Sequence, residues 1–84
     1  MHDESTIAQQ MLLLLDKRGT DKSICPSEVA RALADESDWR ALMEPVRLVA
    51  RKLARQGDLL ITQRGEPVDP DDFKGPVRIR IAQV

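Results

Sequence analysis

The sequence predicts an α+β domain in which three helices pack on a small antiparallel sheet. Residues 24–57 read as two short helices separated by a polar break, and the second of these helices is basic. An alternating segment, residues 59–63, follows that helix directly. This order of elements is typical of a helix-turn-helix that leads into a β-wing. We therefore expect a winged helix-turn-helix fold with three helices and a small antiparallel β-wing.

The length and the charge of the chain limit what it can do. Its 84 residues are expected to form a single domain, residues 1–84, of which residues 1–4 are a frayed terminus. The formal net charge is −1 and the pI is about 5.7. The average surface is therefore not that of a general nucleic-acid binder, and any basic contact surface must be local.

Cysteine usage and hydropathy favour a cytoplasmic protein. One cysteine excludes an internal disulfide and argues against a zinc site, which favours a reducing compartment. The apolar run at residues 11–15 is too short to span a membrane, and no basic-then-apolar leader precedes it. We expect no contact with a membrane.

The first helix is expected over residues 5–18, with Gly19 at its C-terminal end. Its apolar residues recur at i, i+4, i+7 and i+8, which places them on one helical face. That face consists of Ile7, Met11, Leu14 and Leu15, and it is widened by Ala8 and Leu12. Leu13 lies off this face because its helical neighbours are polar.

Leu13 has two interpretations. It is either an ordinary exposed leucine or, together with Leu12, part of a contact with a second subunit. Small domains often gain stability by dimerising. The second interpretation predicts a homodimer through the first helix.

A very short strand at Ile24 and a second helix are expected next. Pro26 suits the first helical position and holds Cys25 in an extended conformation. Glu28 stands three residues after Cys25, where the acid of a capping box belongs. The helix ends before an acidic segment, residues 35–38, and it buries Val29, Ala30, Leu33 and Ala34. Cys25 reads as a half-buried residue at the helix start, and the alternative is a redox-active thiol.

Pro45 is expected to open the third helix, with Glu44 at the boundary; the alternative is one longer helix that Pro45 kinks. Before it, Asp38 or Ser37 caps a turn that carries Trp39, Leu42 and Met43. The third helix ends at Gly57. Its buried face has the spacing i, i+3, i+4 and i+7 and consists of Val46, Val49, Ala50 and Leu53.

Two strands are predicted in the last third of the chain, over residues 59–63 and 77–82. The second strand alternates apolar and basic residues: Val77, Ile79 and Ile81 with Arg78 and Arg80. The connection, residues 64–76, is too long for a tight hairpin turn and is expected to be a loop. Within it, residues 69–73 have the pattern of a single capped helical turn whose Phe73 packs back onto the sheet.

The third helix carries the positive charge. Between residues 38 and 56 five bases stand against two acids, a net charge of +3, and the bases are Arg40, Arg47, Arg51, Lys52 and Arg55. Arg47, Arg51 and Arg55 lie four apart and form a stripe opposite or beside the buried face. Such a stripe is typical of a recognition helix that reaches the phosphates and bases of double-stranded DNA, with Arg40 contacting phosphate from the flank. The alternative is a solvated helix face whose arginines pair with carboxylates.

The loop after the first strand argues against DNA contact, because phosphates repel carboxylates. Four acids there outnumber two bases: Glu66, Asp69, Asp71 and Asp72 against Arg64 and Lys74. The second hypothesis is therefore a protein–protein interaction module on the same scaffold, with no nucleic-acid binding.

Catalysis has little support in the sequence. His2, the only histidine, lies in the expected frayed terminus. The chain has no glycine-rich phosphate loop and no nucleophile motif. Asp69, Asp71 and Asp72 do not form a calcium loop, because Phe73 occupies the third ligand position and no closing glutamate follows. We expect no enzyme activity, no cofactor, no metal and no small-molecule substrate.

Several segments carry a family resemblance: residues 24–31 (ICPSEVAR), Trp39-Arg40 with residues 43–47 (MEPVR), residues 51–53 (RKL) and residues 75–80 (GPVRIR). With these segments the chain, from Ile7 onward, resembles a bacterial family of short proteins catalogued as a domain of unknown function. The resemblance implies a small winged-helix-like cytosolic domain and no established activity. More loosely, the chain is similar to winged helix-turn-helix regulators, from which its acidic wing departs. The order of elements and the basic third helix, not the resemblance, give the first hypothesis: a DNA-binding winged-helix protein that acts as a small transcriptional regulator or accessory factor.

Overall fold

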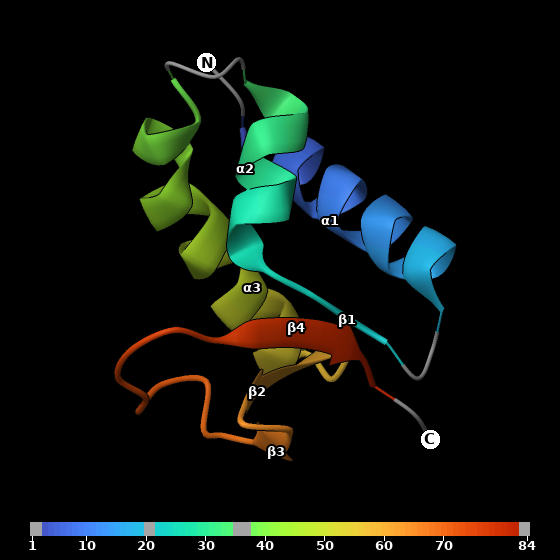
Figure 1. Ribbon diagram of the computed structural model, residues 1–84, viewed down its shortest axis with the longest axis vertical. Coiled ribbons are helices and arrows are strands. Elements are labelled where there is room, and N and C mark those ends of the chain that lie inside the picture. Colours follow the sequence, from blue (N-terminus) through green and yellow to red (C-terminus); the bar gives the residue numbers. More distant parts are fainter. Residues whose placement is uncertain (1–2, 20–21, 35–37, 83–84) are drawn as a thin grey trace.

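The computed structural model describes residues 3–19, 22–34 and 38–82. In this part of the chain the helices are α1 (Glu4–Arg18), α2 (Pro26–Leu33), the 3₁₀ helix η1 (Trp39–Leu42) and α3 (Met43–Arg55), and the strands are β1 (Ser23–Ile24), β2 (Leu59–Gln63), β3 (Glu66–Pro67) and β4 (Arg78–Ile81) (Figure 1). The predicted α+β class, with three α-helices and an antiparallel sheet, is confirmed for the described residues. None of these helices is long and apolar enough to cross a membrane.

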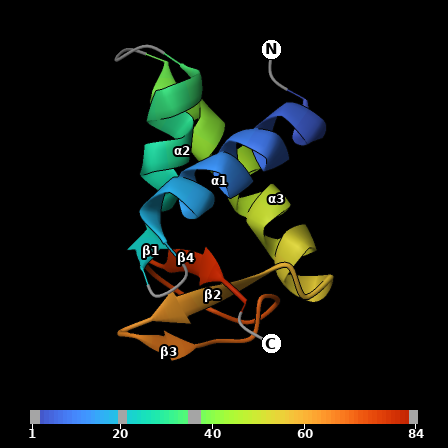
Figure 2. The same ribbon diagram turned by 90° about the vertical axis from the view of Figure 1, so that its right-hand side faces the viewer.

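The strands form one antiparallel sheet in the order β1-β4-β2-β3. Ile79 of β4 lies at its centre, paired with Ile24 on one side and with Ile61 on the other. Both edge strands have only two residues, which limits pairing with another chain. The helices lie on one side of the sheet (Figures 1 and 2).

The core lies between the helices and the sheet, and α1 contributes its predicted face to it. Ile7, Met11 and Leu15 are at most 1% exposed, and Leu14 is half-buried. The expectation that Leu12 widens this face is wrong, because its side chain is 40% exposed. Successive helical residues point about 100° apart, so Leu12 is turned away from the core that holds Met11.

α1 begins one residue earlier than the sequence predicts. The Thr6 N–H donates a hydrogen bond to Asp3 Oδ1 (2.8 Å), which makes Asp3 the N-cap residue. A carboxylate at this position also compensates the helix dipole. The frayed terminus expected over residues 1–4 is therefore wrong for Asp3 and Glu4, and His2 lies outside the described residues.

The predicted capping box opens α2. The Cys25 N–H donates a hydrogen bond to Glu28 Oε2 (2.7 Å), and Pro26 occupies the first helical position. Burial alone would raise the pKa of Glu28, but the hydrogen bond from Cys25 and the ion pair with Arg18 outweigh it and hold the pKa below its usual value. Glu28 thus stabilises the fold above the pKa of an unfolded glutamate, and this contribution is lost as the pH falls through the folded-state pKa.

α3 begins at Met43, two residues before Pro45. The expectation that Pro45 opens the helix is therefore wrong by two positions, although Pro45 still lies in the first turn, where a backbone N–H has no helical partner. Asp38 precedes η1 without a side-chain hydrogen bond to its backbone, and Ser37 lies outside the described residues. The inward faces of α2 and α3 are buried as predicted at Val29, Ala30, Val46, Val49, Ala50 and Leu53, whereas Leu33 and Ala34 are half-buried.

β3 is absent from the sequence prediction, which expects a loop over residues 64–76. The chain turns back at Arg64 and Gly65, whose φ angles are 53° and 81°. Two positive φ angles are typical of the type I′ turn that joins hairpin strands. Gln63 then pairs with Glu66. Because arginine rarely adopts positive φ, Arg64-Gly65 is a weak turn signal.

The connection from β3 to β4, residues 68–77, is called the β3–β4 loop below. The predicted capped turn is present as a single hydrogen-bonded turn without a helix: Asp69 accepts hydrogen bonds from the N–H groups of Asp71 (Oδ1, 2.9 Å) and Asp72 (backbone oxygen, 3.1 Å). Phe73 is half-buried against the core.

Candidate nucleic-acid interface

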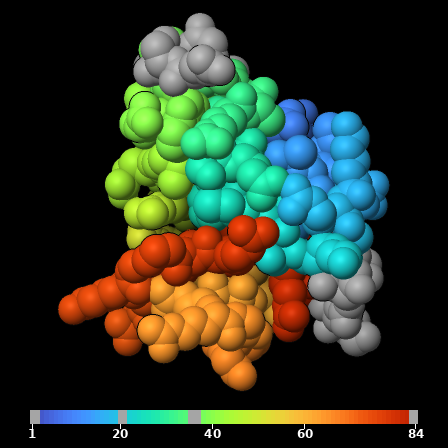
Figure 3. All heavy atoms as spheres, viewed as in Figure 1, coloured from blue at the N-terminus to red at the C-terminus, as the bar shows by residue number. Residues whose placement is uncertain are grey.

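The basic residues lie away from the inward face of α3. Since Val46, Val49, Ala50 and Leu53 are buried in the core, the intervening positions face solvent or neighbouring loops. α2, η1 and α3 lie side by side, and the β3–β4 loop lies below them near the sheet (Figure 3). We call Arg40, Arg47, Arg51, Lys52 and Arg55 together the α3 face.

Arg55 is paired with an acid of the β3–β4 loop. Its Nε donates a hydrogen bond to Asp71 Oδ1 (2.8 Å), and its Nη2 contacts the same oxygen. The hydrogen bond and the charge of Arg55 hold the pKa of Asp71 below its usual value, and Asp71 in turn raises the pKa of Arg55. The pair therefore stays ionised at neutral pH, and the charge of Arg55 is compensated within the chain.

Lys52 is compensated as well. Its Nζ forms an ion pair with Glu4 in the first turn of α1. Both partners are about half exposed, so the pair contributes little to stability. It nevertheless places a carboxylate beside Lys52, which weakens its attraction for another anion.

Arg51 and Arg40 stack on aromatic rings instead. The guanidinium carbon of Arg51 lies 5.2 Å from the ring centre of Phe73, and that of Arg40 lies 4.7 Å from the ring of Trp39. Neither arginine has an ion pair or a hydrogen bond with a carboxylate among the described residues. A cation–π contact uses no hydrogen bond, so it leaves the N–H donors of the guanidinium available.

Arg47 is partly covered by the protein. Its Nε is shielded from solvent and has no hydrogen-bond acceptor among the described residues. A buried donor without an acceptor costs free energy, so Arg47 is the least favourably placed member of the α3 face. The predicted stripe of Arg47, Arg51 and Arg55 therefore consists of one covered, one stacked and one ion-paired side chain.

Arg31 is absent from the sequence prediction, although it joins the α3 face in space. It lies in the last turn of α2, and its guanidinium carbon is 4.4 Å from the ring centre of Trp39. The helical patterns do not reveal this contact because a break separates α2 from η1. The sequence signal that could have indicated this contact is Trp39, because it lies soon after α2 and a tryptophan ring attracts guanidinium groups.

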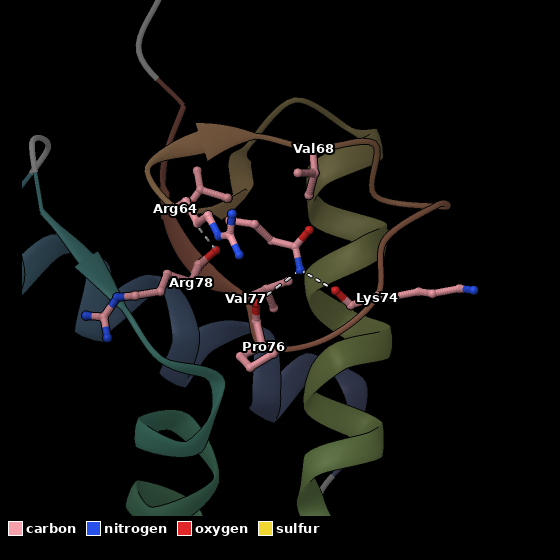
Figure 4. Close-up of a pocket in the computed structure, with 8 residues that line it drawn as sticks. Arg64, Val68, Lys74, Pro76, Val77 and Arg78 are labelled. Carbon is pink, nitrogen blue, oxygen red and sulfur yellow. Dashed lines mark hydrogen bonds between the residues drawn. The ribbon is translucent and has the colours of Figure 1, made fainter.

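A tether to β2 sets the position of the β3–β4 loop. Gln63 Nε2 donates hydrogen bonds to the backbone oxygens of Lys74 (2.5 Å) and Pro76 (3.1 Å), beside a surface pocket of about 760 Å³ (Figure 4). The side chain of Lys74 points away from this pocket (Figure 4). The tether holds the loop against the sheet, in the position from which Asp71 and Phe73 reach α3.

The family resemblance is confirmed by comparison with family models. Residues 4–82 match the model of a family described as "Protein of unknown function (DUF3253)". The chain belongs to this family. No curated protein matches it in sequence. The α3 face and the β3–β4 loop of this DUF3253 protein both lie within the matched residues.

The DUF3253 chain also exposes large apolar side chains on two helices. On α1, Leu12 is 40% and Leu13 is 47% exposed. On α3, Leu48 is 43% exposed between the arginines of the α3 face, and the sequence patterns do not single it out. Leu12 and Leu13 remain candidate contact residues for a second subunit.

Metal ligands do not converge in the described part of the DUF3253 chain. No group of three or more His, Cys, Asp or Glu side chains there lies close enough together to hold an ion. The acids of the β3–β4 loop are instead used in the Asp69 turn and in the pair with Arg55.

Proposed function

We propose that this chain is a winged-helix domain that binds double-stranded DNA through the α3 face and acts as a small cytoplasmic transcriptional regulator or accessory factor. The order of elements supports a winged helix: α3 runs directly into β2, and the β2–β3 hairpin with the β3–β4 loop takes the place of the wing. The single free cysteine, Cys25, suits the reducing cytoplasm.

The observation that carries the proposal is the pair of stacked arginines, Arg40 and Arg51. Both lie beside the outward side of α3, and neither forms an ion pair with a described carboxylate, although the charge of Arg51 contributes to the lowered pKa of Asp71. Their N–H edges match phosphate oxygens, which guanidinium groups bind with two parallel hydrogen bonds. Lys52 and Arg55 take secondary roles, because binding DNA requires them to loosen existing ion pairs.

The acidic β3–β4 loop is compatible with this proposal. Asp71 faces Arg55, so part of the negative charge of the loop is directed toward α3. The remaining acids lie at the end of α3 nearest the sheet, whereas Arg40 lies at its opposite end. We therefore expect the DNA to contact η1 and the outward side of α3 as far as Arg51, which lies in the third turn of the helix.

Arg51→Ala is expected to weaken duplex binding about eightfold at roughly 0.1 M salt. The loss of one phosphate contact makes the slope of log affinity against log salt shallower by about 0.9, which is about eightfold in affinity for a tenfold dilution of salt from roughly 1 M. Fluorescence anisotropy of a labelled short duplex over a salt series measures both quantities. Lys17→Ala is the matched control, since it removes the same charge from an exposed position on α1. Absence of binding by the wild-type chain at low salt and micromolar concentration would refute the proposal.

A second candidate function is a protein–protein interaction module that forms a homodimer through α1. The exposed leucines Leu12 and Leu13 favour it. Leu13→Asp is then expected to convert a dimer into a monomer, because a charge in an apolar contact loses its hydration. Light scattering coupled to size-exclusion chromatography measures the mass. A wild-type monomer at high micromolar concentration would contradict this candidate.

A further inference from the structure

Trp39 holds two guanidinium groups against its ring. The guanidinium carbon of Arg31 lies 4.4 Å and that of Arg40 lies 4.7 Å from the ring centre. We call Arg31, Trp39 and Arg40 the Trp39 cluster. Both arginines are exposed, while Trp39 is half-buried and packs against the core. The indole is thus a fixed platform, and tryptophan is the aromatic residue that attracts cations most strongly.

Among the residues that the structure describes, the two arginines of this cluster differ from several other helical cations in having no ion-pair partner. Arg18, Lys52 and Arg55 each pair with a carboxylate. Neither Arg31 nor Arg40, by contrast, has an ion pair among the residues that the structure describes. Two like charges on one ring repel each other, and an anion that binds both would relieve this repulsion.

Stacking leaves both arginines ready to bind an anion. A cation–π contact uses no hydrogen bond, and neither guanidinium donates one to a described residue, so the N–H donors of both stay available. A side chain that is already held in place loses less conformational entropy on binding. The same arrangement recurs at Arg51 on Phe73, so both aromatic residues of the chain, one Trp and one Phe, support an arginine.

We propose that the Trp39 cluster binds phosphate groups of the DNA backbone. This inference rests on the proposed function and extends the contact surface from α3 onto α2. Phosphate fits because its oxygens accept two parallel hydrogen bonds from a guanidinium fork. The backbone of a duplex fits because α2 packs against η1, which leads directly into α3 (Figure 1). Arg31 and Arg40 therefore bind phosphate at the start of α3, about 20 Å from the Arg55–Asp71 pair if α3 rises about 1.5 Å per residue.

Trp39 provides its own spectroscopic test, because the chain has one tryptophan and no tyrosine. Titration of the full chain with an unlabelled duplex is expected to change the tryptophan emission with the midpoint that anisotropy gives for a labelled duplex. Arg31→Ala is expected to lower affinity about eightfold at roughly 0.1 M salt and to reduce the salt slope by about 0.9. Arg31→Lys keeps the charge but lacks the fork, so it is expected to restore binding only in part.

Lys17→Ala is again the matched control, and the unfolding midpoint of each variant verifies that the fold is intact. If the wild type binds and Arg51→Ala weakens binding while Arg31→Ala behaves as Lys17→Ala does, the cluster inference fails and the proposed function stands. If the wild type binds no duplex, the proposed function fails, and the inference fails with it. If a polyglutamate peptide equals the duplex in affinity and in emission change, the cluster does not select phosphate, and an acidic protein partner replaces DNA as its ligand.

Discussion

Leu15→Ala is expected to lower the free energy of unfolding by about 2–5 kcal/mol, because it removes three buried carbons and leaves a cavity. Leu15 is 0% exposed in the core, in the last part of α1. α1 packs against α2, α3, β1 and β4, so the cavity would open where helices and sheet meet. A small domain has a total stability of about 5–15 kcal/mol, and the variant would lose a large part of it. Urea denaturation followed by circular dichroism measures the change.

Leu13→Ala is the matched control for this prediction. It is the same substitution in the same helix, but the Leu13 side chain is 47% exposed. We expect a change within about 0.5 kcal/mol, measured at a concentration at which the chain is monomeric. Equal losses for the two variants would mean that α1 does not pack through Leu15.

Most of the fold follows from local sequence patterns. The spacing of Ile7, Met11 and Leu15 predicts the buried face of α1, and the alternation around Ile79 predicts β4, since each pattern repeats with the period of its own element. The prediction of the strands fails where the backbone conformation of one residue determines whether a strand forms. β3 depends on a positive φ at Arg64, which no periodic pattern reveals.

The candidate site is less predictable, because its electrostatics depend on contacts between distant segments. Periodicity alone places Arg51 and Arg55 opposite or beside the buried face of α3. It does not show that the β3–β4 loop folds back so that Asp71 pairs with Arg55 and Phe73 supports Arg51. The same applies to Lys52, whose partner Glu4 lies 48 residues earlier in the chain. Of the five cations that the sequence predicts for the DNA contact, two form ion pairs, two contact aromatic rings and one is partly covered by the protein.

Asp71→Asn is expected to strengthen duplex binding about eightfold at roughly 0.1 M salt and to steepen the salt slope by about 0.9, because Arg55 becomes available for one more phosphate. In the wild-type chain Asp71 stays ionised at neutral pH, since Arg55 holds its pKa below the usual value. The Arg55–Asp71 contact therefore competes with DNA at every pH at which the duplex is normally studied. Asparagine keeps the shape of Asp71 but carries no charge.

Asp72→Asn separates the local effect from a general change in charge. Asp72 is adjacent and exposed, its carboxylate has no ion pair among the described residues, and its substitution removes the same charge. If the acidic loop acts only through its overall field, both variants should strengthen binding equally. If Asp71 acts by occupying Arg55, the gain belongs to Asp71→Asn and disappears when Arg55→Ala is added. A gain that survives Arg55→Ala would instead assign the effect to repulsion between the loop and the phosphates, and the β3–β4 loop would then lie against the DNA.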